Sequence, residues 1–437
     1  MKRFVLILLM YILAVQPGIA QQDYQYDTVL KGGHVIDPAN NINGIMDIAV
    51  KDGKIARIST SIPDGSAAQT LDVSGYYVTP GLIDIHTHIY FNAMDRIRSV
   101  IPDDICPNSG CTTVVDAGTS GADTFEDFKN IHDIKTQRTR VLAFINIAAP
   151  GMTRAEQDPL QFDVQKAVAM ARKYPDMIVG FKTAHYLAGE SNPYDEIHTP
   201  WASVDSSLAA GKAAGLPVMF DVRIRPPQGE YPARSFREHY LVRARPGDIQ
   251  THVFGGPHYI IREDGTVNPD YFKAKKRGII FDVGHGGAAF RFRNAVPAVQ
   301  QGFIPNSIST DLHAGNSSGA ALNMPYVMSK FLSMGVPLEE VIRMSTVNPA
   351  EEINHPELGT LSEGSSADIA VLELLTGNFG YVDARNGKIY GNKRLQCKMT
   401  LFGGQVVYDI DGISATEWTK IPKSNARYWD RGTTQNY

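Results

Sequence analysis

Two histidines separated by a single residue are the clearest chemical feature of the sequence. His86 and His88 follow an apolar run that begins at Leu82, and Pro80 and Gly81 provide a turn signal before it. Alternate residues of a strand share a face, so both imidazoles are expected together at the C-terminal end of that strand. Two neutral imidazoles placed in this way can bind one divalent metal ion, although a strand can also carry two histidines as packing residues.

Four more candidate ligands each end a later apolar run, namely Lys182, Asp221, His252 and Asp311. A lysine that ends a buried strand tends to lose its charge, and a neutral amine can add CO2 to form a carbamate that bridges two metals. Each residue also has an ordinary alternative role: a salt-bridged lysine, a turn or capping aspartate, or a core histidine bonded to a carbonyl. Their joint occurrence at strand ends favours a metal site.

The elements that must position these residues form a regular alternation. Eight short apolar or β-branched runs cover residues 82–86, 112–116, 141–147, 178–182, 217–221, 248–252, 279–283 and 307–311. Helix-like stretches lie between or after them, at residues 125–136, 164–174, 204–214 and 321–334. This alternation predicts an α/β fold, a (β/α)8 TIM barrel whose active site lies at the C-terminal ends of the strands.

The segments on either side of the barrel have a different pattern. Residues 25–79 and 355–410 alternate in polarity without helical periodicity and carry Gly and Asp-Gly turn signals. Neither segment offers enough strands for a stable sheet, so we expect them to form one small β-sandwich domain built from both chain ends. Two separate β-appendages are the alternative. The barrel domain then spans residues 80–354, and residues 411–437 form a tail without an assigned function.

The first twenty residues have the composition of a cleaved signal peptide. A basic start at Lys2 and Arg3 precedes an apolar core at residues 4–15, and small residues end the segment at Ala20. We therefore expect a secreted or periplasmic protein, with an uncleaved anchor as the alternative. The three cysteines exclude a disulfide framework, and they leave open a single bond between Cys106 and Cys111.

Composition limits the remaining function classes. The 437 residues are 43% hydrophobic and 20% charged, which is ordinary for a globular enzyme. A formal net charge of −4 without a long basic run argues against nucleic-acid binding. No membrane span is expected apart from the signal segment, and the sequence leaves the oligomeric state open, a homo-oligomer included.

The strand-end motifs resemble those of the amidohydrolase superfamily, and within it the amidohydrolase/deacetylase group near dihydroorotase. The resemblance rests on residues 78–88, 110–118, 180–182, 245–254, 281–286, 308–313 and 345–350. It implies a cofactor of two divalent metals, most plausibly zinc. His86, His88 and Asp311 would hold the first metal, and a carboxylated Lys182 would bridge to a second one.

The second metal would also be held by the residues that end strands five and six, Asp221 and His252. The strand-five position is usually histidine in this family and is aspartate here. Aspartate can bind zinc but adds negative charge and favours harder metals. The identity and occupancy of the second metal are therefore open at this point.

The resemblance also implies a reaction. A metal-activated hydroxide would attack an amide or ester carbonyl, and Asp311 would move its proton to the leaving group. His285 and His185 are candidate substrate contacts, with His313 a weaker one. Arg223 and Arg225 are spaced to pair with a substrate carboxylate, although solvated surface arginines would have the same spacing.

We therefore expect deacetylase-like cleavage of a small acylated amino or hydroxy acid. Hydrolysis of a cyclic amide, as in dihydroorotase and hydantoinase, is the alternative within the enzymes. A barrel that has kept the fold but acts only as a binding protein is the alternative outside them.

Overall fold

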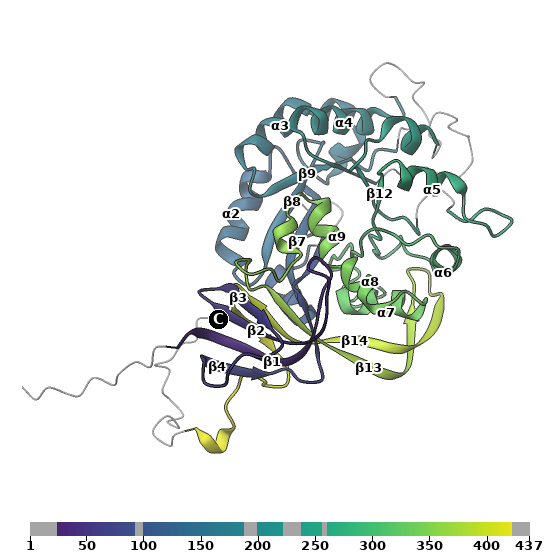
Figure 1. Cartoon of the computed structure of the whole chain (residues 1–437). Coiled ribbons are helices and arrows are strands. Elements are labelled where there is room, and N and C mark those ends of the chain that lie inside the picture. Colours follow the sequence, from purple (N-terminus) through teal and green to yellow (C-terminus); the bar gives the residue numbers. More distant parts are fainter. Residues whose placement is uncertain (1–23, 92–98, 188–198, 222–236, 256–259, 422–437) are drawn as a thin grey trace, which may run out of the picture.

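A computed structural model describes residues 24–91, 99–187, 199–221, 237–255 and 260–421. Two sheets organise this part of the chain, one parallel and surrounded by helices, the other mainly antiparallel (Figure 1). No helix among the described residues is both long and apolar enough to cross a lipid bilayer. The sequence-predicted signal peptide and the residues Arg223 and Arg225 lie outside the described ranges.

The parallel sheet has seven strands in the spatial order β12-β11-β10-β9-β8-β7-β6. Neighbours in the sheet are thus neighbours in the chain, as expected when each strand is followed by a crossover on the same side. The strands are β6 (Leu82–Thr87), β7 (Cys111–Gly121), β8 (Arg140–Asn146), β9 (Ile178–Lys182), β10 (Val218–Phe220), β11 (Ile249–Gln250) and β12 (Ile280–Phe281).

The eighth apolar run is bridged to both edges of this sheet without forming a regular strand. Parallel bridges pair Ser307 with Asp282, just after β12, and Leu312 with Thr87, the last residue of β6. Asp311 interrupts the extended backbone because its φ is 49°, in the left-handed region. Residues 307–312 therefore lie between the two edges of the parallel sheet.

Apolar side chains fill the inside of the parallel sheet. The buried cluster combines residues of β6 to β11 with two residues at the end of α9: Ile83, Ile85, Val115, Ala117, Leu142, Phe144, Val179, Met219, Ile249, Ala350 and Ile353. Burial of this apolar surface is the main force that holds the strands around one axis. The polar residues at the C-terminal ends of the strands lie beyond this apolar cluster and are available to form a site.

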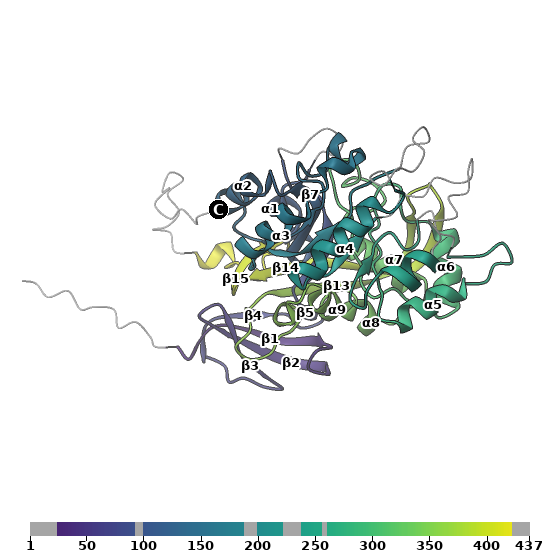
Figure 2. The same cartoon turned by 90° about the horizontal axis from the view of Figure 1, so that it is seen from above.

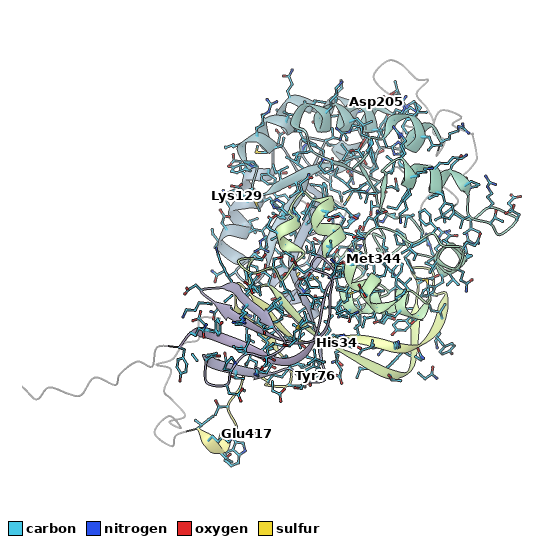
Figure 3. All side chains as sticks on the ribbon, viewed as in Figure 1. His34, Tyr76, Lys129, Asp205, Met344 and Glu417 are labelled. Carbon is cyan, nitrogen blue, oxygen red and sulfur yellow. The ribbon has the colours of Figure 1, made fainter. Side chains whose placement is uncertain are left out.

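Helices cover the outer face of the parallel sheet, where α2, α3 and α4 form one layer (Figure 1). Lys129 on α2 and Asp205 on α4 mark the outside of that layer (Figure 3). The helices are α1 (Pro102–Ile105), α2 (Phe125–Lys135), α3 (Val164–Lys173), α4 (Ala202–Ala214), α5 (Pro269–Lys276), α6 (Phe292–Gln300), α7 (Met324–Ser333), α8 (Leu338–Arg343) and α9 (Val347–Glu352). Helix α7 begins at Met324, later than the sequence pattern predicts, because Asn323 caps it and Pro325 occupies its first turn.

The other helical elements are the short 3-10 helices η1 (Pro107–Ser109), η2 (Arg154–Gln157), η3 (Pro159–Gln161), η6 (Pro356–Leu358) and η7 (Trp418–Lys420), and the π-helix η5 (Arg237–Arg243). Cys106, Cys111 and Cys397 are buried free thiols, so the structure contains no bond between Cys106 and Cys111.

The second sheet has eight strands and joins the two ends of the chain (Figure 2). Its order is β15-β14-β13-β5-β1-β2-β3, with β4 paired to β1. At the junction, Ile369 of β13 pairs antiparallel with Pro80 of β5. The strands are β1 (Tyr26–Asp37), β2 (Ile42–Lys51), β3 (Lys54–Ser59), β4 (Ala67–Asp72), β5 (Tyr77–Pro80), β13 (Ile369–Val382), β14 (Lys388–Phe402) and β15 (Gln405–Asp409).

Candidate metal centre

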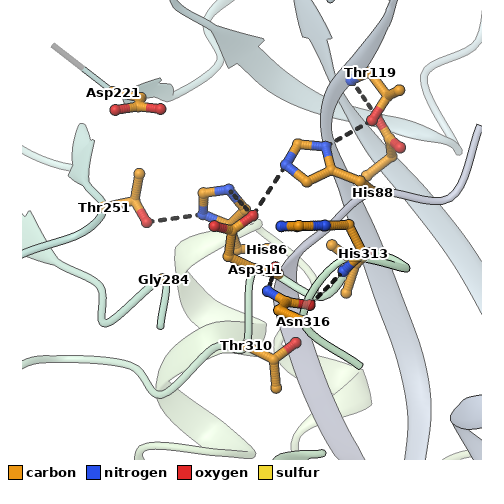
Figure 4. A network of polar contacts seen from close by, with 12 residues as sticks. His86, His88, Thr119, Asp221, Thr251, Gly284, Thr310, Asp311, His313 and Asn316 are labelled. Atoms are coloured by element: carbon orange, nitrogen blue, oxygen red, sulfur yellow. Dashed lines mark hydrogen bonds and ion pairs between the residues drawn. The ribbon is translucent and has the colours of Figure 1, made fainter. Parts of the chain in front are cut away.

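Two histidines and an aspartate converge at the end of β6. His88 Nε2 lies 3.0 Å from Asp311 Oδ1, and His86 Nε2 lies 3.6 Å from the same oxygen (Figure 4). One candidate ligand atom from each of the three residues lies within 4.8 Å of the other two. Two imidazoles and one carboxylate form a donor set suited to zinc.

The far nitrogen of each imidazole is held by a threonine hydroxyl. His86 Nδ1 lies 2.8 Å from Thr251 Oγ1, and this hydroxyl donates its own proton to Asp282 at 2.7 Å. Thr251 therefore accepts from His86 Nδ1–H, which leaves the Nε2 lone pair available for a metal. His88 Nδ1 lies 2.8 Å from Thr119 Oγ1 in the same way (Figure 4). Sequence analysis identified neither threonine, and the only signal was the position of Thr251 directly before His252.

A second group of predicted ligands surrounds Asp221, which directly follows β10. Asp221 Oδ2 lies 3.5 Å from His252 Nε2 and 3.7 Å from Lys182 Nζ. The His252 ring is held by its Nδ1–H, which donates to Gly284 O at 2.6 Å. The rings of His86 and His252 lie 4.9 Å apart between centroids, so the two groups of ligands are adjacent.

Lys182 fits a metal site better than it fits an ordinary core position. Its side chain is fully buried, and among the described residues Nζ has no hydrogen-bond partner. A buried ammonium without hydrogen bonds is costly. A carbamate on Nζ, facing metal ions held by the neighbouring imidazoles, would remove that cost, so the residues present fit a pair of divalent metals.

His185 lies against Asp221 rather than apart from the ligands. Its Nε2 is 2.5 Å from Asp221 Oδ2, and its Nδ1 is 3.0 Å from Glu156 Oε2. Glu156 is fully buried on η2. Sequence analysis did not single out Glu156, because nothing in its local pattern distinguishes it from a surface glutamate.

The pKa shifts differ between the two groups of ligands. The pKa of His86 is lowered, whereas those of His252 and His185 are raised, because neighbouring carboxylates outweigh burial. Burial lowers the pKa of His86 to about 4, although the nearby Asp311 carboxylate opposes this shift. For Asp311, burial alone would raise the pKa, but His86 and His88 outweigh it and hold the pKa of the carboxyl below its usual range. Burial opposes ionisation of Asp221 as well, yet His185 and His252 hold its pKa well below the usual value.

The remaining predicted substrate contacts are placed differently. His285 is fully buried, with Nδ1 2.9 Å from Gly286 O and Nε2 2.6 Å from Lys330 Nζ, so both ring nitrogens already have protein contacts. His313 Nδ1 accepts a hydrogen bond from Gly315 N, and its ring centroid lies 6.3 Å from that of His88. Arg223 and Arg225, outside the described residues, stay predictions.

Comparison with known proteins identifies relatives of this chain. A sequence profile of the amidohydrolase family matches residues 291–407. A deacetylase from Agrobacterium fabrum (strain C58) is 31% identical over 356 residues, which cover 79% of this chain and 82% of the relative.

Two solved structures extend the similarity over the fold. An adenine deaminase is 26% identical with a TM-score of 0.77 and covers 88% of this chain and 100% of its own. A dihydroorotase is 26% identical with a TM-score of 0.72 and covers 87% of this chain and 97% of its own.

The chain therefore belongs to the amidohydrolase superfamily, as the strand-end motifs predicted. It is a hydrolase of the kind that acts on carbon–nitrogen bonds.

Proposed function

We propose that the protein is a metal-dependent hydrolase that cleaves the acyl amide or ester bond of a small acylated amino or hydroxy acid. The observation that carries this proposal is the convergence of two ligand groups, around Asp311 and around Asp221, at one end of the parallel sheet. The deacetylase from Agrobacterium fabrum supports an acyl substrate.

In this proposal His86, His88 and Asp311 hold one divalent ion, and Asp221, His252 and carboxylated Lys182 hold a second. A divalent ion in such a site lowers the pKa of water and polarises a carbonyl oxygen. Zinc is the metal that the imidazoles favour.

The chain itself moves the proton. The Asp311 side chain is 14% exposed beside His86, so its carboxylate is accessible to accept a proton from water and release it to a leaving nitrogen or oxygen. The imidazoles of His86 and His88 are buried and held by threonine hydroxyls. In this proposal they hold the metal ion and do not exchange protons with solvent.

The finer architecture and the location belong to the same proposal. Residues 80–354 form a closed (β/α)8 barrel in which residues 307–312 take the eighth position, and residues 25–79 and 355–410 form a small β-sandwich. Residues 1–20 direct export to the periplasm or the medium. Retention of residues 1–20 in protein isolated from its native host would contradict cleavage of this segment.

Hydrolysis of a cyclic amide is the second candidate. The dihydroorotase structure favours it, since 26% identity extends over 87% of this chain. The described residues do not distinguish the two substrates, because both reactions need the same metals and the same proton carrier.

A substrate screen separates the candidates. N-acyl amino acids and O-acyl hydroxy acids are compared with cyclic imides and ureas, using wild type, Asp311→Asn, and Asp133→Asn as a surface control on α2. We expect turnover of the acyl compounds, with kcat lower by about 100-fold or more in Asp311→Asn because the amide cannot carry the proton. Zinc content is measured in parallel, since Asp311 is also a ligand. Turnover of cyclic compounds alone would overturn the deacylase assignment, and absence of all turnover would favour a binding role.

A further inference from the structure

We infer that His185 is a ligand of the second metal and supplies there the imidazole that the end of β10 lacks. This inference rests on the proposed metal-dependent function and assigns a residue of that same site. It starts from Asp221, which stands where the family that the sequence resembles usually has a histidine.

The first argument is a shared orientation of four imidazoles. In each, Nδ1 faces a protein acceptor and Nε2 faces a carboxylate at the centre. The acceptors are Thr251 for His86, Thr119 for His88, the carbonyl of Gly284 for His252, and Glu156 for His185. Metal-bound histidines are held in this way, with the outer nitrogen on a hydroxyl, carbonyl or carboxylate. His185 therefore has the orientation of a ligand.

The second argument is convergence on one atom. Asp221 Oδ2 lies 2.5 Å from His185 Nε2, 3.5 Å from His252 Nε2 and 3.7 Å from Lys182 Nζ. An ion bound by Asp221 is thus within reach of both imidazoles without any change in the backbone. Three of the four side chains are nine-tenths or more buried, and the fourth, His252, is 12% exposed.

The third argument is that His185 is fixed in place. Glu156 Oε2 lies 3.0 Å from His185 Nδ1, while Glu156 Oε1 accepts from the His185 backbone at 3.1 Å and from Asn146 Nδ2 at 2.9 Å. A carboxylate behind an imidazole raises its basicity as a ligand. With His185, the second site combines two imidazoles with oxygen donors, a set that keeps its preference for zinc despite the aspartate.

A zinc-loaded crystal structure of the wild type tests the inference directly. We expect His185 Nε2 at about 2.0–2.1 Å from the second zinc, the usual bond length to histidine. A zinc bound to Asp221 and His252, with His185 Nε2 still bonded only to the carboxylate, would overturn the inference.

Zinc affinity provides an independent test. His185→Gln can still donate a hydrogen bond to Asp221 but offers no imidazole. In chelator competition we expect this variant to bind the second zinc more weakly than wild type. The loss of affinity should exceed the roughly 10- to 100-fold that follows from loss of an outer-shell partner. Adding Asp221→His to this variant moves an imidazole to β10 and should restore the second zinc.

The matched control is His355→Gln, because His355 Nδ1 also lies 2.8 Å from a carboxylate, that of Glu357, outside the metal centre. Circular dichroism of the metal-free proteins checks their folding. Unchanged zinc affinity in folded His185→Gln would refute the inference and leave the proposed function intact. A wild type that binds no zinc would refute the proposed function itself.

Discussion

Lys182 is a buried lysine whose amine lacks hydrogen bonds among the described residues. It ends an apolar strand, it is fully buried, and Nζ lies 3.7 Å from the carboxylate of Asp221 without a hydrogen bond among the described residues. Lys330 is equally buried, but its Nζ contacts two carbonyls and the His285 ring. The two lysines are therefore equally buried but differ in the hydrogen bonds of Nζ. Of the two, Lys182 is the one for which we expect a covalent modification.

We predict that Lys182 carries a carbamate in the metal-loaded protein. Labelling with 13C-bicarbonate should give one carbamate resonance in the 13C NMR spectrum, because the deprotonated amine adds CO2 and the metals stabilise the product. The resonance should vanish in Lys182→Ala and persist in Lys330→Met, the matched buried lysine. A metal-loaded wild type without the resonance would show that Lys182 is unmodified.

At the level of elements, the turn after β12 controls how closely the strands approach Asp311. Gly284 and Gly286 have φ of 44° and 55°, a region that favours glycine. A Cβ at Gly286 would lie 2.3 Å from Asp311 Oδ2, and a Cβ at Gly284 would lie 2.1 Å from Thr251 Oγ1. The two glycines thus allow the turn to pass close to one ligand and to the threonine that holds another.

We predict that Gly286→Ala weakens the first metal site as well as the fold. Gly302→Ala is the control, because Gly302 also has a positive φ of 84° but a Cβ there meets nothing within 4 Å. Both changes should cost about 1–2 kcal/mol of unfolding free energy through backbone strain. Only Gly286→Ala should also lower zinc affinity and kcat, since its methyl group displaces Asp311. Equal zinc affinity in the two variants would show that Asp311 adapts without loss.

In the whole molecule, Lys330 links the parallel sheet to the second sheet. It lies on α7, and its Nζ reaches His285 Nε2 at 2.6 Å and the carbonyl of Val382, the last residue of β13, at 2.8 Å. Figure 1 shows α7 next to the long strands β13 and β14. Burial lowers the pKa of Lys330 to about 7, against an attraction from Asp383 that is too weak to compensate.

This pKa predicts a pH dependence of stability. Between pH 7 and 10.5 the unfolded chain keeps the Lys330 proton while the folded protein has released it. The unfolded state then binds more protons, so the free energy of unfolding rises with pH in this window. The free energy of unfolding, measured with urea, should rise less steeply with pH in Lys330→Met than in wild type, by up to about 1.4 kcal/mol per pH unit. Lys166→Met, which changes an exposed lysine on α3, is the control. Equal slopes in Lys330→Met and wild type would contradict the shift.

The sequence by itself determined the class of fold and the main candidate ligands. Apolar runs and helical stretches are local patterns, and seven of the eight runs coincide with strands of the parallel sheet. The candidate ligands His86, Lys182 and Asp221 are visible in the sequence because a polar residue at the end of an apolar run is apparent without knowing its neighbours. The family motifs then indicated which of these ends share a metal.

Only the tertiary structure decided which side chains support the ligands and how the two chain ends meet. Thr251 lies 165 residues after His86, and the pairing of β5 with β13 joins residues nearly 300 positions apart. The contact of His185 with Asp221 depends on the irregular segment after β9 and on a buried glutamate, neither of which has a periodic signature. Such contacts arise from the curvature of the parallel sheet and from side-chain rotamers, and local sequence spacing specifies neither.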